Sequence, residues 1–110
     1  QVTEKFRTLI YQGALPAGSR LPSVRQLAME LSINPNTIQR AYMTLEQEGL
    51  IYPVKGRGNF VADSSQVQKI NRESYRKEFT ALIQKGRNTG FNREELEKML
   101  AETFEKEDEQ

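Results

Sequence analysis

Apolar side chains recur every three or four residues in three segments of the N-terminal half, which is the spacing of an amphipathic helix. The first segment predicts a helix over residues 2–12. A second helix begins at Val24, after the N-cap Ser23. A third begins at Pro35, after the N-cap Asn34. The apolar stripes are Val2, Phe6, Leu9 and Ile10, then Val24, Leu27, Ala28 and Leu31, then Ile38, Ala41, Tyr42 and Leu45.

After the third helix the pattern changes to short extended runs. Residues 50–54 and 60–62 form two such runs, separated by a turn over residues 55–59 that contains two glycines. Pro53 favours an edge strand, because proline lacks the N–H that a central strand donates. We therefore expect a small β-hairpin.

Helical spacing returns in the last part of the chain. A fourth helix carries an apolar series that fades near Gly86–Gly90. Asn92, with Glu95 three residues later, opens a fifth helix, and we expect residues 105–110 to fray. The apolar positions are Val67, Ile70, Tyr75, Phe79, Leu82 and Ile83 on the fourth helix, and Leu96, Met99, Leu100 and Phe104 on the fifth.

The order helix, helix, turn, helix, strand, turn, strand is that of a winged helix-turn-helix. We predict a mainly α protein with a small β-hairpin, in two parts. Residues 1–62 form a winged helix-turn-helix DNA-binding domain. Residues 63–110 form a two-helix dimerisation region, because two helices alone have little against which to bury their apolar stripes.

The amino-acid composition excludes several kinds of catalytic and metal-binding chemistry. The 110 residues include no cysteine and no histidine, which removes thiol chemistry, histidine–carboxylate relays and the commonest metal ligands. With no nucleophile–base pair in view, we expect no enzyme, no metal and no cofactor. No apolar run approaches the roughly 20 residues that cross a bilayer. No signal peptide is visible, although Gln1 is not an initiator and a lost leader stays open.

The net charge of +1 conceals an uneven distribution. Residues 1–62 carry seven Lys or Arg against four Asp or Glu, and residues 64–93 carry seven against two. Residues 94–110 instead carry two against eight. This division suits a basic body with an acidic end directed away from a polyanion, or simply a solvated acidic helix face.

The start of the third helix and the hairpin turn hold the candidate DNA contacts. Amide side chains pair with adenine and arginine pairs with guanine in the major groove, while the first N–H groups of the helix offer a seat for phosphate. Taken singly, each of these residues is better explained as a helix cap, a surface amide, an ion-pair partner or a turn glycine. Taken together, they favour DNA binding by Arg25, Asn34, Asn36, Thr37, Gln39, Arg40, Lys55, Gly56 and Arg57.

Three linked blocks give the sequence a specific resemblance. Residues 16–28, residues 34–51 and residues 55–61 together resemble the signature of the GntR family of bacterial transcription regulators. The Asn-Pro-Asn-Thr run at residues 34–37 and the short remainder of the chain resemble the YtrA-like subfamily. The resemblance implies a cytoplasmic homodimeric repressor of a palindromic double-stranded DNA operator, with control of a neighbouring transporter operon.

The resemblance also assigns residues. Arg25 matches a DNA-contacting arginine of the second helix, and the other contacts above match the recognition helix and the wing tip. Many relatives carry arginine where this chain has Pro35 and Gln39, so its base-reading set is richer in amides. The dimerisation residues expected on helices four and five are Phe79, Leu82, Ile83, Leu96, Met99, Leu100 and Phe104.

Two other functions remain open from the residues. The winged helix could be a protein-interaction module with the acidic end as its docking surface. Alternatively, the regulator could respond to a small-molecule effector of unknown identity. Its pocket would lie between the winged domain and the C-terminal helices, near Tyr75 or Phe79.

Overall fold

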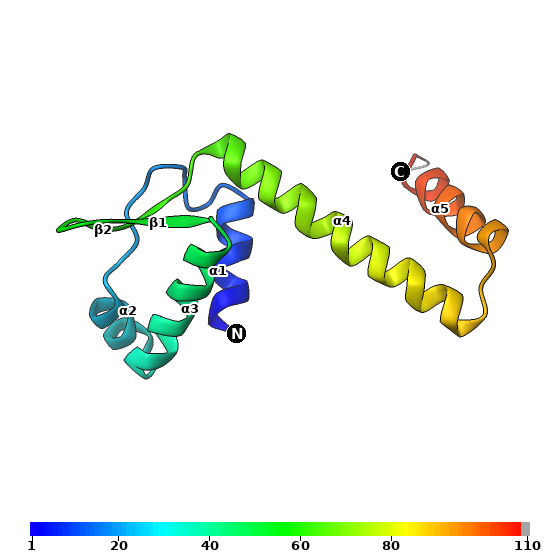
Figure 1. The fold of residues 1–110 in the computed structure, drawn as a ribbon. Helices are drawn as coiled ribbons and strands as arrows, with labels where there is room; N and C mark the ends of the chain where they lie inside the picture. Colours follow the sequence, from blue (N-terminus) through cyan, green and yellow to red (C-terminus); the bar gives the residue numbers. More distant parts are fainter. Residues whose placement is uncertain (109–110) are drawn as a thin grey trace. The chain divides into compact units, whose positions relative to one another are not determined.

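A computed structural model of the chain describes residues 1–108 and confirms the predicted order of elements (Figure 1). The chain divides into two compact units, the first comprising Gln1–Glu73 and the second beginning at Ser74. No described helix is long and apolar enough to cross a membrane. The elements are α1 (Val2–Tyr11), α2 (Val24–Leu31), α3 (Pro35–Gln47), β1 (Ile51–Val54), β2 (Gly58–Val61), α4 (Ser64–Thr89) and α5 (Arg93–Asp108).

The short helices begin where the sequence predicts because their caps are local. The Ser23 hydroxyl accepts a hydrogen bond from the Gln26 N–H at 3.1 Å. The Gln26 side chain does not complete a capping box and instead donates to Glu30 at 3.3 Å. Between α2 and α3, Ser32 adopts a left-handed conformation with φ of +53°, which turns the chain sharply.

The hydrophobic core of the first unit gathers around α3, which packs against α1, α2 and β1. All four stripe residues predicted for α3 are buried. The prediction for Leu31 is wrong, because this last residue of α2 is 48% exposed. The other core residues are Ile10, Leu21, Leu27, Ala28, Leu50, Ile51, Val61, Ala62 and Val67.

The wing is an antiparallel pair of strands in which Ile51 lies opposite Val61. Residues 18–21 of the connector before α2 lie beside β2 as a third extended segment, which the sequence did not indicate. The Gly18 N–H donates to the Val61 carbonyl at 2.8 Å, and the Val61 N–H donates to the Ser19 carbonyl at 2.9 Å. β2 is therefore flanked on both sides, and β1, which contains Pro53, is the edge strand as predicted.

α4 ends within the Gly86–Gly90 stretch where the sequence predicted its end, and α5 is longer than predicted. α4 passes through Gly86 without interruption and ends at Thr89, just before Gly90 with φ of +111°. Residues 105–108 belong to α5, so the prediction that they fray is wrong, and residues 109–110 lie outside the described part.

The starts of these helices are well capped. The Asp63 carboxylate accepts from the Gln66 N–H at 2.9 Å, and this bond lowers the pKa of Asp63. Asn92 and Glu95 exchange side-chain-to-backbone hydrogen bonds of 2.9 and 3.0 Å, the reciprocal capping box that the sequence predicts at α5. The predicted boundary at residue 62 marks the end of the wing, while the two compact units divide eleven residues later within α4.

Candidate nucleic-acid interface

Contacts on the buried side of α3 hold the helix-turn-helix against the core. The Tyr42 hydroxyl donates to the Pro22 carbonyl at 2.7 Å, which connects the middle of α3 to the segment just before α2. Phe6 of α1 meets the Tyr42 ring edge to face at 5.7 Å. Because Tyr42 is buried, desolvation raises its pKa to about 12. These contacts fix the angle at which α2 and α3 present their outer faces.

A partly buried ion pair fixes the far end of α3. Arg7 of α1 donates from two nitrogens to the two carboxylate oxygens of Glu48, at 2.9 and 2.7 Å. Such two-point pairing sets geometry as well as charge. Glu48 raises the pKa of Arg7, so the guanidinium stays charged.

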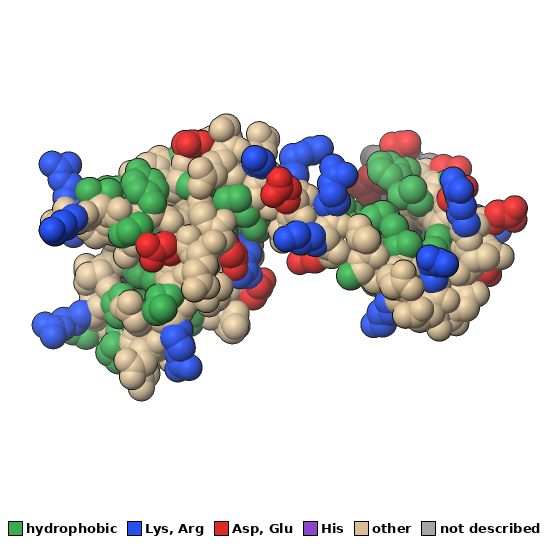
Figure 2. Space-filling view, viewed as in Figure 1, with side chains coloured by type: hydrophobic (Ala, Val, Ile, Leu, Met, Phe, Trp, Pro, Cys, Tyr) green, Lys and Arg blue, Asp and Glu red, His purple; other side chains and the backbone are tan. Residues whose placement is uncertain are grey.

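The predicted contact residues all lie at the surface of the first unit. Eight of the nine are exposed, and Thr37 is half-buried. In the view of Figure 2, Lys and Arg side chains project from the wing end and from the α2–α3 corner of this unit. Within residues 1–108 no carboxylate pairs with Arg25, which leaves its charge available and weighs against the alternative of a surface ion pair.

The backbone at the start of α3 does not offer the expected phosphate seat. Pro35 has no N–H, the Asn36 N–H donates to the Asn34 side chain at 2.8 Å, and the Thr37 N–H donates to the Asn34 carbonyl at 2.9 Å. The local cap thus uses the donors of the first turn. Contacts with nucleic acid from this turn fall to side chains, of which Asn36, Gln39 and Arg40 are exposed.

The wing tip brings two cations together on a tight turn. The Arg57 N–H donates to the Val54 carbonyl at 2.9 Å and closes the turn between the strands. Gly56 lies between Lys55 and Arg57 with φ of +79°, and a Cβ built there would meet no atom within 4 Å. The tip therefore presents exposed positive charge and an open backbone, which suits contact with a phosphate chain.

Arg20 is a candidate contact that the sequence reasoning missed. It pairs with Phe60 of β2 across the third extended segment, and its guanidinium lies over Gly58, with Nε 3.3 Å from the position of a Cβ at that glycine. The side chain is exposed beside the wing. The signal in the sequence was weak, because the pairing joins residues forty positions apart.

The acidic residues of the described chain form no candidate metal site. Among residues 1–108 no group of three or more Asp or Glu side chains is arranged to hold an ion. The side chains of the candidate interface are cations, amides and a hydroxyl, groups that hydrogen-bond to phosphates and base edges.

This arrangement of three helices, a wing and an exposed basic face defines a winged helix-turn-helix protein. Residues 1–61 match the family model described as "Bacterial regulatory proteins, gntR family". The HTH-type transcriptional repressor YtrA of Bacillus subtilis is 36% identical over 70 residues, which cover 64% of this chain and 54% of that protein. The chain thus spans about half the length of that curated relative.

Solved structures extend the comparison. A GntR family transcriptional regulator from Listeria monocytogenes is 32% identical, with a TM-score of 0.76 over 93% of this chain and 90% of that one. The AraR DNA-binding domain in complex with operator ORR3 is 34% identical, with a TM-score of 0.53 over 56% of this chain and 75% of that one.

The chain belongs to the GntR family, and within it is YtrA-like. It is a DNA-binding transcriptional regulator with a winged helix-turn-helix followed by two C-terminal helices. Membership in a family of regulatory proteins confirms the prediction that it is not an enzyme.

Proposed function

We propose that the chain is a homodimeric repressor that reads a palindromic operator with the face formed by Arg25, the start of α3 and the wing tip. The observation that carries this proposal is the exposure of these groups on one unit, with no acidic partner at Arg25 among residues 1–108. The AraR domain, which has the same fold, was solved on its operator. YtrA, which is 36% identical over 70 residues, is named a repressor.

Each part of the face has a distinct role in this proposal. Asn36 and Gln39 read base edges from the major groove, because an amide can donate and accept at once. Arg25 and Arg40 contact guanine or phosphate, and Thr37 meets a phosphate or a thymine methyl group. The Asn34 side chain is occupied as a helix cap, so its contribution is to place the first turn of α3.

The wing supplies affinity more than sequence selection. Lys55 and Arg57 neutralise phosphates next to the groove that α3 occupies, and Gly56 lets the backbone approach. Each phosphate neutralised by a cation releases condensed counterions, so affinity falls as salt is raised.

The apolar face of the second unit supports the dimer. α5 has no buried residue, and seven large apolar side chains between Phe79 and Phe104 are exposed in addition to Tyr75. Green surface gathers on this unit in Figure 2. A groove of about 610 Å³ between α4 and α5 is lined by Phe79, Ile83, Phe91, Leu96 and Leu100, among others. Exposed apolar surface of this extent marks an association site.

A second copy of the chain fits this face because a twofold pair buries the same patch from both sides. The predicted dimerisation residues Leu82, Met99 and Phe104 lie on the same two helices and are 64%, 49% and 65% exposed. A twofold dimer then places two recognition helices on half-sites about one helical turn, or a multiple of it, apart.

The proposal is tested by fluorescence anisotropy with DNA from upstream of the chain's own gene, which is the first place to seek the operator. We expect this DNA to bind at least ~1,000-fold more tightly than a shuffled sequence of equal length. The affinity should fall by several powers of ten between low and moderate salt. Equal binding to both DNAs at every salt concentration contradicts an operator in this region.

A further inference from the structure

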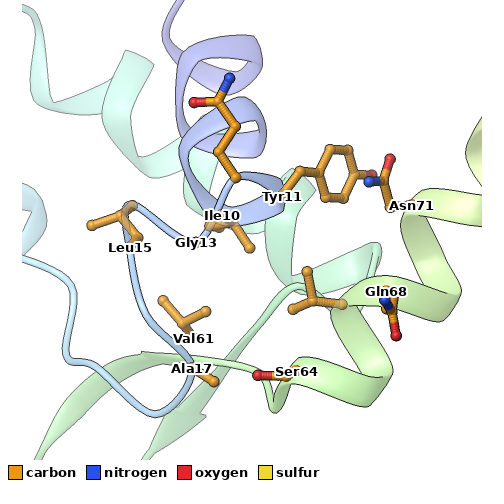
Figure 3. Close-up of a pocket in the computed structure, with 11 residues that line it drawn as sticks. Ile10, Tyr11, Gly13, Leu15, Ala17, Val61, Ser64, Gln68 and Asn71 are labelled. Atoms are coloured by element: carbon orange, nitrogen blue, oxygen red, sulfur yellow. The ribbon is translucent and has the colours of Figure 1, made fainter.

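A pocket in the first unit lies behind the wing, where α1, the connector and the start of α4 meet (Figure 3). It has a volume of about 340 Å³ and is lined only by residues of the first unit. Its apolar wall consists of Ile10, Leu15, Ala17, Val61 and Val67. Its polar groups come from Tyr11, Gln12, Ser64, Gln68 and Asn71.

The lining contains hydrogen-bonding groups but no charged side chain. Side-chain amides and hydroxyls donate and accept hydrogen bonds, which matches the dual capacity of hydroxyl groups on a ligand. A charged ligand would leave water here without a counter-ion, at a cost that no lining group offsets. The pocket chemistry therefore favours an uncharged ligand with several hydroxyl groups.

The size of the pocket sets an upper limit on the size of that ligand. At roughly 30 Å³ for each water molecule, about 340 Å³ corresponds to about eleven waters. The heavy atoms of a hexose, about a dozen, are bonded to one another and occupy less space than that many separate waters, so a hexose fits within the pocket. In Figure 3 the Tyr11 ring extends from α1 toward Asn71 of α4, which gives the site an aromatic surface beside an amide. A sugar ring has the same pairing of an apolar C–H face with hydroxyl groups.

We propose that this pocket binds a neutral polyhydroxylated small molecule of monosaccharide size. The inference goes beyond the DNA-binding role and does not depend on it. The site differs from the effector pocket considered from the sequence, because neither Tyr75 nor Phe79 lines it.

Ligand binding at this place has a route to the DNA-binding face. Ala17 lies next to Gly18, whose N–H bonds the Val61 carbonyl, and Val61 itself lines the pocket while forming the inner end of β2. Ser64, Gln68 and Asn71 lie on the first two turns of α4. A bound ligand thus contacts the backbone that supports the wing and the helix that leads to the second unit.

The experiment is an NMR titration of the whole ¹⁵N-labelled chain, without DNA, using D-glucose, D-galactose, D-ribose and myo-inositol as probes. We expect at least one probe to shift amide signals, with the largest shifts confined to residues 10–17 and 61–71. Glucose 6-phosphate, its charged counterpart, should produce no such shifts. Because no DNA is present, failure here and failure of the operator experiment are distinguishable.

Two variants decide whether the shifts report this pocket. Gln68→Ala combined with Asn71→Ala removes two lining amides from exposed helical positions where alanine is well tolerated. Loss of two hydrogen bonds should weaken binding at least about tenfold. Gln84→Ala, at an exposed position of the same helix outside the pocket, should bind as the wild type does. Three results overturn the proposal: no response to any neutral probe at millimolar concentration, equal response in the double variant, or equal binding of the phosphate.

Discussion

At the scale of single residues, Tyr42 links the core to the interface. Its ring is buried on α3 against Phe6, and its hydroxyl bonds the Pro22 carbonyl just before α2. The apolar spacing predicted the burial, because spacing along a helix is a local property. It could not predict the hydroxyl's partner, since Pro22 lies twenty residues away.

Tyr42 should make folding stability sensitive to alkaline pH. Its pKa is about 12 in the folded chain and about 10 when unfolded, so folding favours the neutral phenol. Its contribution is complete below about pH 10 and is lost as pH rises toward about 12, a loss of up to roughly 2–3 kcal/mol. Urea unfolding of the wild type and Tyr42→Phe at several pH values measures this.

The phenylalanine variant is the control for other alkaline titrations. Near neutral pH the substitution should lower the free energy of unfolding by about 1 kcal/mol, because only the hydrogen bond to Pro22 is lost. Toward pH 12 the wild type loses its advantage and the two stabilities converge or cross. Stabilities that stay parallel from neutral pH upward would show that Tyr42 does not titrate in this range.

At the scale of elements, Gly49 follows α3 in the chain and contacts the start of α4. Its φ of +82° suits glycine, and its carbonyl accepts a hydrogen bond from the Gln66 side chain at 2.7 Å. A Cβ at this position would lie 3.2 Å from the Gln66 amide nitrogen and 3.3 Å from the Ile70 side chain. The turn therefore needs glycine for its conformation and for the space that α4 occupies.

Comparing Gly49→Ala with Gly13→Ala separates the cost of the backbone conformation from the cost of the contact with α4. Gly13 follows α1 with φ of +79°, but a Cβ there meets nothing within 4 Å. We expect about 1 kcal/mol of destabilisation at Gly13 from conformation alone, and about 2 kcal/mol or more at Gly49, where the α4 contact is also disturbed. Urea unfolding gives both values, and equal costs would mean that the contact with α4 contributes nothing.

The same distinction between local and distant causes explains what the sequence predicted among the elements. The caps at Ser23, Asn34 and Asn92 act within three residues of themselves, and each helix begins where predicted. Leu31 fits the apolar spacing of α2 yet is 48% exposed at the last residue of that helix. The third extended segment was missed because its partner strand lies about forty residues along the chain.

In the candidate site, too, the sequence predicted the features with local causes and missed those that depend on the folded structure. Residue types and spacing were enough to predict that the start of α3 and the wing tip lie at the surface. The sequence could not show that the first-turn N–H groups are used by the cap of Asn34, nor that Arg20 joins the wing. Whether the nine predicted residues contact DNA stays a prediction.

At the scale of the whole molecule, the exposed apolar face of the second unit predicts a dimer in solution. Sedimentation equilibrium should give twice the chain mass of 12.7 kDa for the wild type. Leu82→Glu combined with Phe104→Glu should give the single-chain mass with helical content intact, because both side chains are about two-thirds exposed in one chain.

Gln84→Glu places the same charge at an exposed position of α4 and should remain dimeric. A wild type that stays at 12.7 kDa at tens of micromolar concentration, or a double variant that dimerises as well as the wild type, contradicts the proposed pairing.

The central claim concerns which face of the molecule reads DNA, and the most direct test compares two arginines of the first unit. Arg25 lies on α2 within the proposed face, while Arg72 lies on α4, which begins on the far side of this unit from the wing turn (Figure 1). Both are exposed, and alanine removes one positive charge from each.

The measurement is operator affinity by fluorescence anisotropy, at one salt concentration, for the wild type, Arg25→Ala and Arg72→Ala. The account predicts that Arg25→Ala weakens binding at least about tenfold, the loss of one specific contact of about 1–3 kcal/mol, while Arg72→Ala stays within about twofold of the wild type. Equal affinity of Arg25→Ala and the wild type, or equal weakening by both substitutions, would contradict the assignment of the reading face.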